Sequence, residues 1–234
     1  IIIMLLVLNR SRLRRKIGAE RQEKELARYQ MTALKSQMNP HFTFNALNSI
    51  QDLILREKSE DAYTYISKFA DLVRKTLNHS DQDFIDIEDE FASLRVYLAL
   101  EQLRFQEDLT IKLETNNISG IAIPPLLIQP FIENALKHGL LHKKGAKHLC
   151  IDFKLKKDLI CTVKDNGIGR QAAGKIQSRR SAPHKSFALK SIEGRFEILK
   201  KLYGKSVGVT FIDLDAGSDV TGTTVIISLP YKNI

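Results

Sequence analysis

The sequence predicts a helical hairpin followed by an α/β sandwich. Residues 17–78 carry apolar side chains at helical spacing with few turn residues, whereas beyond residue 109 short strand-like apolar runs are interspersed with helices. A chain of 234 residues can form one large domain or two small ones. The segment 79–87 is polar and turn-like, so we place the boundary between the two parts there, near residue 80.

The hairpin is predicted from two amphipathic stretches. In residues 17–56 only Gly18 and Pro40 interrupt the helix formers, and apolar residues recur at steps of three and four: Met31, Leu34, Met38, Leu47, Ile50 and Ile54. A second helix at about 60–78 presents an inner face of Ala62, Tyr65, Ile66, Phe69, Leu72 and Val73. Because one hairpin buries little surface, we expect two copies to pair into a four-helix bundle, which makes the protein a homodimer.

The second part begins with a helix at about 88–105, whose acidic first turn suits the helix dipole. Strands are expected at 109–114, 149–155, 159–163, 207–212 and 223–229. Helices are expected near 127–138 and 189–202. This irregular order predicts a sheet covered on one face by helices.

The net charge of +9 is concentrated in two places. Residues 10–16 hold five basic side chains and residues 166–192 hold six, with no acidic residue in either segment. The rest of the chain is therefore slightly acidic, unlike a uniformly basic nucleic-acid binder. We expect no nucleic-acid partner. Cys150 and Cys161 lie in apolar runs and are interpreted as small buried hydrophobes, with no spacing typical of a zinc site.

The chain starts with eight apolar residues, too few to cross a bilayer, which needs about 20. The basic cluster follows this run, whereas a secretory signal would place it before. We interpret residues 1–8 as the end of a transmembrane helix and residues 9–33 as a juxtamembrane basic segment and linker helix on the cytoplasmic side. The alternative is a buried or cloning-derived terminus with a solvated basic stretch.

The segment Asn39-Pro40-His41-Phe42 contains a candidate nucleophile. Proline bends or breaks a helix, which would expose the imidazole of His41 beside the bend. Asn45 lies one turn further along the same face, where it could hold the ring or position a water. An ordinary buried histidine is the alternative for this segment taken alone.

Two downstream segments outweigh that alternative. In Glu133-Asn134-Ala135-Leu136-Lys137-His138-Gly139 the polar side chains share one helical face and Gly139 is expected to end the helix. Asn134 offers a carbonyl oxygen for a metal, while Lys137 and His138 could reach phosphates. Asp165-Asn166-Gly167-Ile168-Gly169 follows a strand. Taken alone, the first segment could be a surface helix with a Glu133–Lys137 pair, and the second an ordinary turn.

Together, these segments resemble the LytS-type sensor histidine kinases. The resemblance implies a dimerisation and phosphoacceptor hairpin at residues 34–80 and a GHKL (Bergerat-type) ATP-binding domain at residues 81–234. It puts Asn134, in the asparagine box, on a magnesium ion carried by the nucleotide and Glu133 beside the waters of that metal. The residue matching Asp165 would accept a hydrogen bond from the adenine amino group, and Gly167 and Gly169 would let the backbone approach the nucleotide.

The chain departs from the family at the second glycine box, where Gly-x-Gly-Leu is expected and Ser186-Phe187-Ala188-Leu189 stands. Ala188 adds a methyl group where a backbone amide should approach a phosphate, while Ser186 and Lys185 could still contribute a hydrogen bond and a charge. The last box matches at Gly222-Thr223-Thr224. Residues 170–185 are interpreted as a mobile basic lid over the phosphates, with a solvated basic loop as the alternative.

By this resemblance the chain autophosphorylates His41 from Mg-ATP and passes the phosphoryl group to an aspartate of a response regulator in a bacterial two-component system, at the cytoplasmic face of the membrane. Phe42 occupies the position where other kinase classes have an acid, so the motif identifies no general base. The alternatives are a catalytically impaired nucleotide-binding scaffold and a GHKL ATPase that does not use His41. A nucleic-acid-binding protein is the least favoured.

Overall fold

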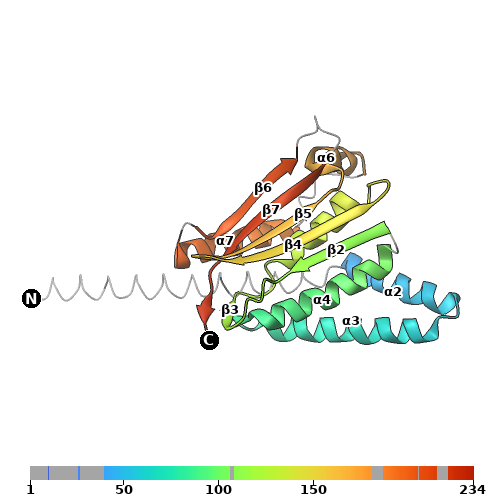
Figure 1. Cartoon of the computed structure of the whole chain (residues 1–234), viewed down its shortest axis with the longest axis horizontal. Coiled ribbons are helices and arrows are strands. Elements are labelled where there is room, and N and C mark those ends of the chain that lie inside the picture. Colours follow the sequence, from blue (N-terminus) through green and yellow to red (C-terminus); the bar gives the residue numbers. More distant parts are fainter. Residues whose placement is uncertain are drawn as a thin grey trace, which may run out of the picture.

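The computed structural model describes Arg10, Leu26 and residues 40–105, 108–180, 187–204, 206–214 and 221–234 (Figure 1). The hairpin consists of α2 (Pro40–Leu55) and α3 (Ser59–Ser80), so the second helix agrees with its predicted bounds within two residues. Among the described residues no helix is both long and apolar enough to cross a bilayer. The predicted membrane end at residues 1–8 lies outside them.

Helix α3 carries two apolar seams that are offset from each other by one position in the sequence. The inner seam packs against α4 (Ile87–Phe105) and contains Ala62, Tyr65, Phe69 and Leu72. The outer seam contains Tyr63, Ile66 and Leu77, and Ile66 is 46% exposed. The prediction that Ile66 faces inward is therefore wrong. The residues of both seams recur at helical spacing, so periodicity alone could not separate them.

The second part is built on a five-stranded sheet in the order β2-β4-β5-β7-β6. Its strands are β2 (Leu109–Glu114), β4 (Lys147–Leu155), β5 (Leu159–Asp165), β6 (Gly208–Leu214) and β7 (Gly222–Leu229). Strands β2 and β4 are parallel and the other neighbours are antiparallel. All five agree with the predicted strands within two residues.

A second, three-stranded sheet was not predicted. It has the order β1-β3-β8, formed by β1 (Ile85–Asp86), β3 (Ile121–Ile123) and β8 (Lys232–Asn233). Strands of two or three residues are too short to show a period of two. This sheet ties the start of α4 to the C-terminus, since Ile234 N donates to the carbonyl of Gly120.

Helices α4, α5 (Gln129–Asn134), the following π-helix η2 (Ala135–Leu140) and α7 (Phe187–Tyr203) share one core with the sheet. Alternate residues of β4 and β5 enter this core: Leu149, Ile151 and Phe153 from β4, and Leu159, Cys161 and Val163 from β5. The prediction of a helical hairpin followed by an α/β sandwich is confirmed. In Figure 1 the hairpin and α4 lie beside the β2 edge of the sheet.

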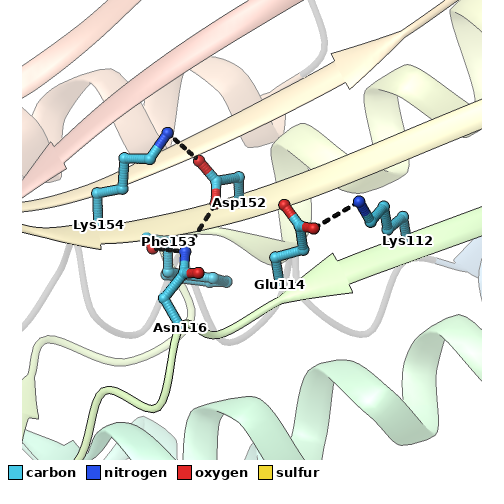
Figure 2. Close-up of polar contacts among 6 residues, drawn as sticks. All are labelled: Lys112, Glu114, Asn116, Asp152, Phe153 and Lys154. Atoms are coloured by element: carbon cyan, nitrogen blue, oxygen red, sulfur yellow. Dashed lines mark hydrogen bonds and ion pairs between the residues drawn. The ribbon is translucent and has the colours of Figure 1, made fainter.

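The opposite face of β2 and β4 carries charges that pair with each other (Figure 2). Lys154 Nζ lies 2.8 Å from Asp152 Oδ2, and Asn116 Nδ2 donates to Asp152 Oδ1 at 2.9 Å. The hydrogen bond from Lys154 holds the pKa of Asp152 below its ordinary value. Lys112 and Glu114 form a further pair along β2. These mutual contacts are typical of a solvated sheet face.

Candidate functional site

Asp165 is the last residue of β5 and is 3% exposed. Its Oδ1 accepts a hydrogen bond from the backbone N–H of Gly167 at 2.8 Å. Burial raises the pKa of this carboxyl to about 6, although backbone donors at Gly167 and Thr223 act in the opposite direction. Asp165 is therefore a buried acceptor held in a fixed orientation at the end of a central strand.

The glycine-containing turn after Asp165 lies directly against the segment of the asparagine box. Ile168 N donates to the carbonyl of Gly139 at 3.2 Å. A Cβ on Gly167 would overlap the backbone of Gly139, and one on Gly139 would lie 2.8 Å from Asp165 Oδ1. The two segments, 26 residues apart from Gly139 to Asp165, thus meet through backbone that has no room for a side chain.

Gly139 does not end the helix as predicted. It lies inside the π-helix Ala135–Leu140, in which Leu141 N donates to Leu136 O at 2.8 Å, a step of five residues. Its φ is not in the left-handed region that glycine caps use. Glycine is required here for close approach to Asp165.

The start of β7 completes this junction. Thr223 pairs with Asp165 in the sheet register and is buried, and Thr221 Oγ1 donates to the carbonyl of Gly167 at 2.8 Å. Gly222 has φ +154° and abuts the Asp165 carbonyl, where a Cβ would not fit. Gly169 has φ +76° and begins α6 (Gly169–Arg180).

Thr224 is the next residue after Thr223 and is half-buried. Side chains alternate between the two faces of a strand, so Thr224 lies on the face opposite to Thr223. The structure therefore does not bring the Thr224 side chain together with Asp165.

The polar residues of the asparagine box remain partly accessible. Ile132, Ala135 and Leu136 are buried in the core. Glu133, Asn134, Lys137 and His138 are half-buried. Magnesium prefers carbonyl and carboxylate oxygens as ligands, so the side chains of Asn134 and Glu133 are chemically suited to bind it.

Sequence reasoning missed two buried groups of α4 whose pKa values the Glu133 charge affects. Burial raises the pKa of Glu101 to about 7 and the charge of Glu133 adds to this, while Arg104, 2.9 Å away, lowers it. Burial also raises the pKa of Tyr97. Both residues belong to a seam with steps of three and four: Ile87, Glu90, Leu94, Tyr97 and Glu101. Acidic residues at positions that the spacing assigns to the core were the sequence signal that could have revealed these buried groups.

Several predicted residues cannot be placed in this site. Lys185 and Ser186 lie outside the described residues. His41 and Asn45 lie in helix α2 and Leu189 lies in α7. For these three residues the structure describes the backbone and not the side chain.

The basic segment after Gly169 is helical over Gly169–Arg180, so it is not a loop there, although most of its described side chains are exposed. A role as a lid over the phosphates stays a prediction. Arg170 lies 3.6 Å from Asp213 of β6 and its guanidinium is 4.7 Å from the Phe211 ring centroid. Both contacts hold Arg170 against β6. Residues 181–186 of the predicted lid lie outside the described residues.

Asp165→Asn is expected to stabilise the fold at pH 7.5 by up to about 2 kcal/mol. The pKa of about 6 lies above the ordinary 3.8, so the folded state binds the proton more tightly than the unfolded state. The free energy of unfolding of the wild type is therefore lowered as pH rises through this interval. Urea unfolding between pH 5 and 8 measures this.

The stabilising effect of Asp165→Asn should shrink below pH 6. Asp81→Asn, at an exposed position, is the control and should change little at any pH. An effect of Asp165→Asn that is the same across the whole range would contradict the prediction.

Comparisons with known proteins find similarity to sensor proteins and histidine kinases. A family model described as histidine kinase matches residues 29–109. Sensor protein LytS of Staphylococcus epidermidis is 31% identical over 219 residues, covering 92% of this chain and 36% of that protein. Sensor histidine kinase/phosphatase LytS of Staphylococcus aureus is 31% identical over 220 residues with the same coverage. The chain thus spans about a third of the length of these curated relatives.

Among solved structures, the histidine kinase domain of the Erythrobacter litoralis EL346 blue-light activated histidine kinase is similar at a TM-score of 0.44 and 16% identity. The likeness covers 76% of this chain and 84% of that chain. It is too distant to assign any residue.

Proposed function

Because the chain belongs to the LytS-type sensor histidine kinase family, we propose that it is a kinase core that phosphorylates His41 from ATP and passes the phosphoryl group to a response-regulator aspartate. The observation that carries this proposal is the backbone junction between Gly139 and Gly167. It joins the segment with the proposed phosphate and metal ligands to the segment with a buried acceptor, and one bound nucleotide would need both.

In this proposal Asp165 accepts a hydrogen bond from the adenine amino group, and Gly167 and Gly169 leave room for the nucleotide. Lys137 and His138 bind phosphate oxygens, and Asn134 binds the magnesium ion that ATP carries. Magnesium bound there supplies charge neutralisation on the phosphates. The remaining proposed nucleotide contacts are Lys185, Ser186, Leu189, Gly222, Thr223 and the backbone of Thr224.

His41 is the proposed nucleophile, since a neutral imidazole has a free nitrogen lone pair near physiological pH. The N–P bond forms as the bond to the leaving ADP oxygen breaks. Asn45, one turn along α2, is proposed to hold the ring. Glu133 is proposed to order water at the metal. Residues 34–80 form the phosphoacceptor part and residues 81–234 the ATP-binding part of this proposal.

A homodimer through the outer seam of the hairpin follows from the exposed apolar residues. Phe44, Leu47 and Ile54 of α2 are 65%, 53% and 57% exposed. Tyr63, Ile66 and Leu77 of α3 are 74%, 46% and 47% exposed. They recur at helical spacing on two adjacent helices, a pattern that a four-helix bundle buries.

Ile66→Glu is expected to convert the dimer to a monomer at micromolar concentration, because it places a charge in the centre of this seam. Light scattering coupled to gel filtration measures the mass. Leu155→Glu is the matched control, since Leu155 is similarly exposed at 43% but lies at the end of β4. If Ile66→Glu remains dimeric, the outer seam is not the interface.

Attachment to the cytoplasmic face of a membrane through residues 1–8, with residues 9–33 as the linker, is part of the same proposal. It rests on the apolar run and the basic cluster that follows it.

The test of the proposed function is incubation with γ-labelled Mg-ATP followed by acid and base treatment of the labelled protein. A phosphohistidine is stable to base and labile to acid, and the label should pass to a receiver domain. A folded chain that binds ATP but takes up no label would instead be an impaired nucleotide-binding scaffold, as Ser186 and Ala188 in the second glycine box would explain.

A further inference from the structure

The loop before α5 contains a peptide group that is hydrogen-bonded to a side chain on each side. This group joins Pro125 to Leu126. Its carbonyl oxygen accepts a hydrogen bond from Arg195 Nη2 at 2.9 Å, and its N–H donates to the carboxylate of Glu90. In a trans peptide these two groups point in opposite directions, so the two side chains hold the plane from opposite sides.

The residue after this peptide group, Leu126, has an unfavourable backbone conformation. Leu126 has φ +60°, in the left-handed region that non-glycine residues rarely adopt. Rotation of the peptide group between Pro125 and Leu126 would change the φ of Leu126 and relieve this conformation. Something must therefore hold the plane as observed.

The side chains of Glu90 and Arg195 can hold this peptide group in place. Glu90 is 2% exposed, and its Oε2 has no hydrogen-bond partner among the described residues. The half-buried guanidinium of Arg195 provides a nearby positive charge. A buried carboxyl group with an unpaired oxygen is costly, so its presence needs an explanation.

The grip links three elements. Glu90 lies on α4, which packs against α3 of the hairpin, and Arg195 lies on α7, whose first three residues belong to the second glycine box. The held plane lies three residues before α5, whose last residues are Glu133 and Asn134. Without the side chains of Glu90 and Arg195 the φ of Leu126 is free to change, and a change in this dihedral angle three residues before α5 would shift the first turn of the helix that carries both site residues.

We propose that Glu90 and Arg195 are positioning residues that clamp the Pro125–Leu126 peptide and thereby orient Asn134 toward the metal–phosphate part of the nucleotide. The inference rests on the proposed function, because it assigns Asn134 to that part of the ligand. Asp165, which faces the adenine, lies at the end of β5 and does not depend on the clamp.

The test is Arg195→Met, which keeps an apolar stem but removes the donor. Affinity for Mg-ATP is expected to fall about tenfold, whereas affinity for adenosine should stay within about twofold. In an Asn134→Ala background the same substitution should cause little further loss of Mg-ATP affinity, because the clamp acts through Asn134. Calorimetric titration measures both ligands, and Lys200→Met, exposed on the same helix, is the control.

Equal losses for both ligands, unchanged Mg-ATP affinity, or additive losses with Asn134→Ala would overturn the clamp. If Arg195→Met does not fold, Arg195→Lys decides in its place. Lysine keeps the charge and a single donor, so about a threefold loss confined to Mg-ATP is expected, and no loss or an equal loss overturns the proposal. A wild type that binds no Mg-ATP would instead refute the proposed function.

Discussion

His41→Ala is expected to abolish incorporation of label from γ-labelled Mg-ATP, with a loss of more than about a thousandfold. Alanine removes the only proposed nucleophile. It should leave nucleotide affinity within about twofold, because the proposed ATP contacts all lie in the second part of the chain. Its position near the start of α2 also favours retention of the fold, since alanine is a good helix former.

Two other histidines provide matched controls. His142 is half-buried in the turn after the π-helix, and His148 is exposed on β4. His142→Ala and His148→Ala should both retain labelling. Acid-labile label that persists in His41→Ala but disappears in either of these variants would assign the nucleophile elsewhere.

Gly167→Ala is expected to have the second largest effect. Its Cβ would overlap the backbone of Gly139, and neither segment can retreat easily because Ile168 N is bonded to Gly139 O. We expect a loss of about 2–3 kcal/mol in the free energy of unfolding, as for other overpacked sites. Nucleotide binding should become undetectable, because the junction between the two segments would have to open.

Gly174→Ala tests whether this effect is specific. Gly174 lies inside α6 and an added Cβ meets nothing within 4 Å. Alanine should stabilise this helix by about 0.5–1 kcal/mol and leave nucleotide binding unchanged. Chemical denaturation and calorimetric titration on both variants make the comparison. Normal nucleotide affinity in Gly167→Ala would show that the junction is not part of the binding site.

The longer elements could be predicted because each has enough residues to show a period. The strand at residues 109–114 matches its predicted bounds, and α4 begins one residue before its prediction. Helix α6 was missed because its sequence is polar and contains Gly169 and Gly174, so no apolar stripe marks it.

The candidate site was predictable where short polar segments carry the proposed ligand contacts. The segments with Asn134 and Asp165 were found from residue types and order, and the structure places their backbones in contact. The reason for Gly139 was not predictable, because a glycine after a polar helix face is equally typical of a C-cap. The Glu90–Arg195 pair was missed since its partners lie 105 residues apart and both contact backbone groups, which leave no pattern in the sequence.

The π-helical turn of Ala135–Leu140 sets the angular phase between Asn134 and Gly139. In an α-helix five residues rotate by about 500°, so the two would face directions about 140° apart. A turn closed by i→i+5 bonds brings the fifth residue back to nearly the same side. Asn134 can therefore face a ligand while Gly139 meets the turn after Asp165. Deleting one residue between them would leave the two positions four residues apart, which in an α-helix is a difference in direction of only about 40°. The segment could then become α-helical with both contacts still on one side, so the π-helical turn is what accommodates the fifth residue.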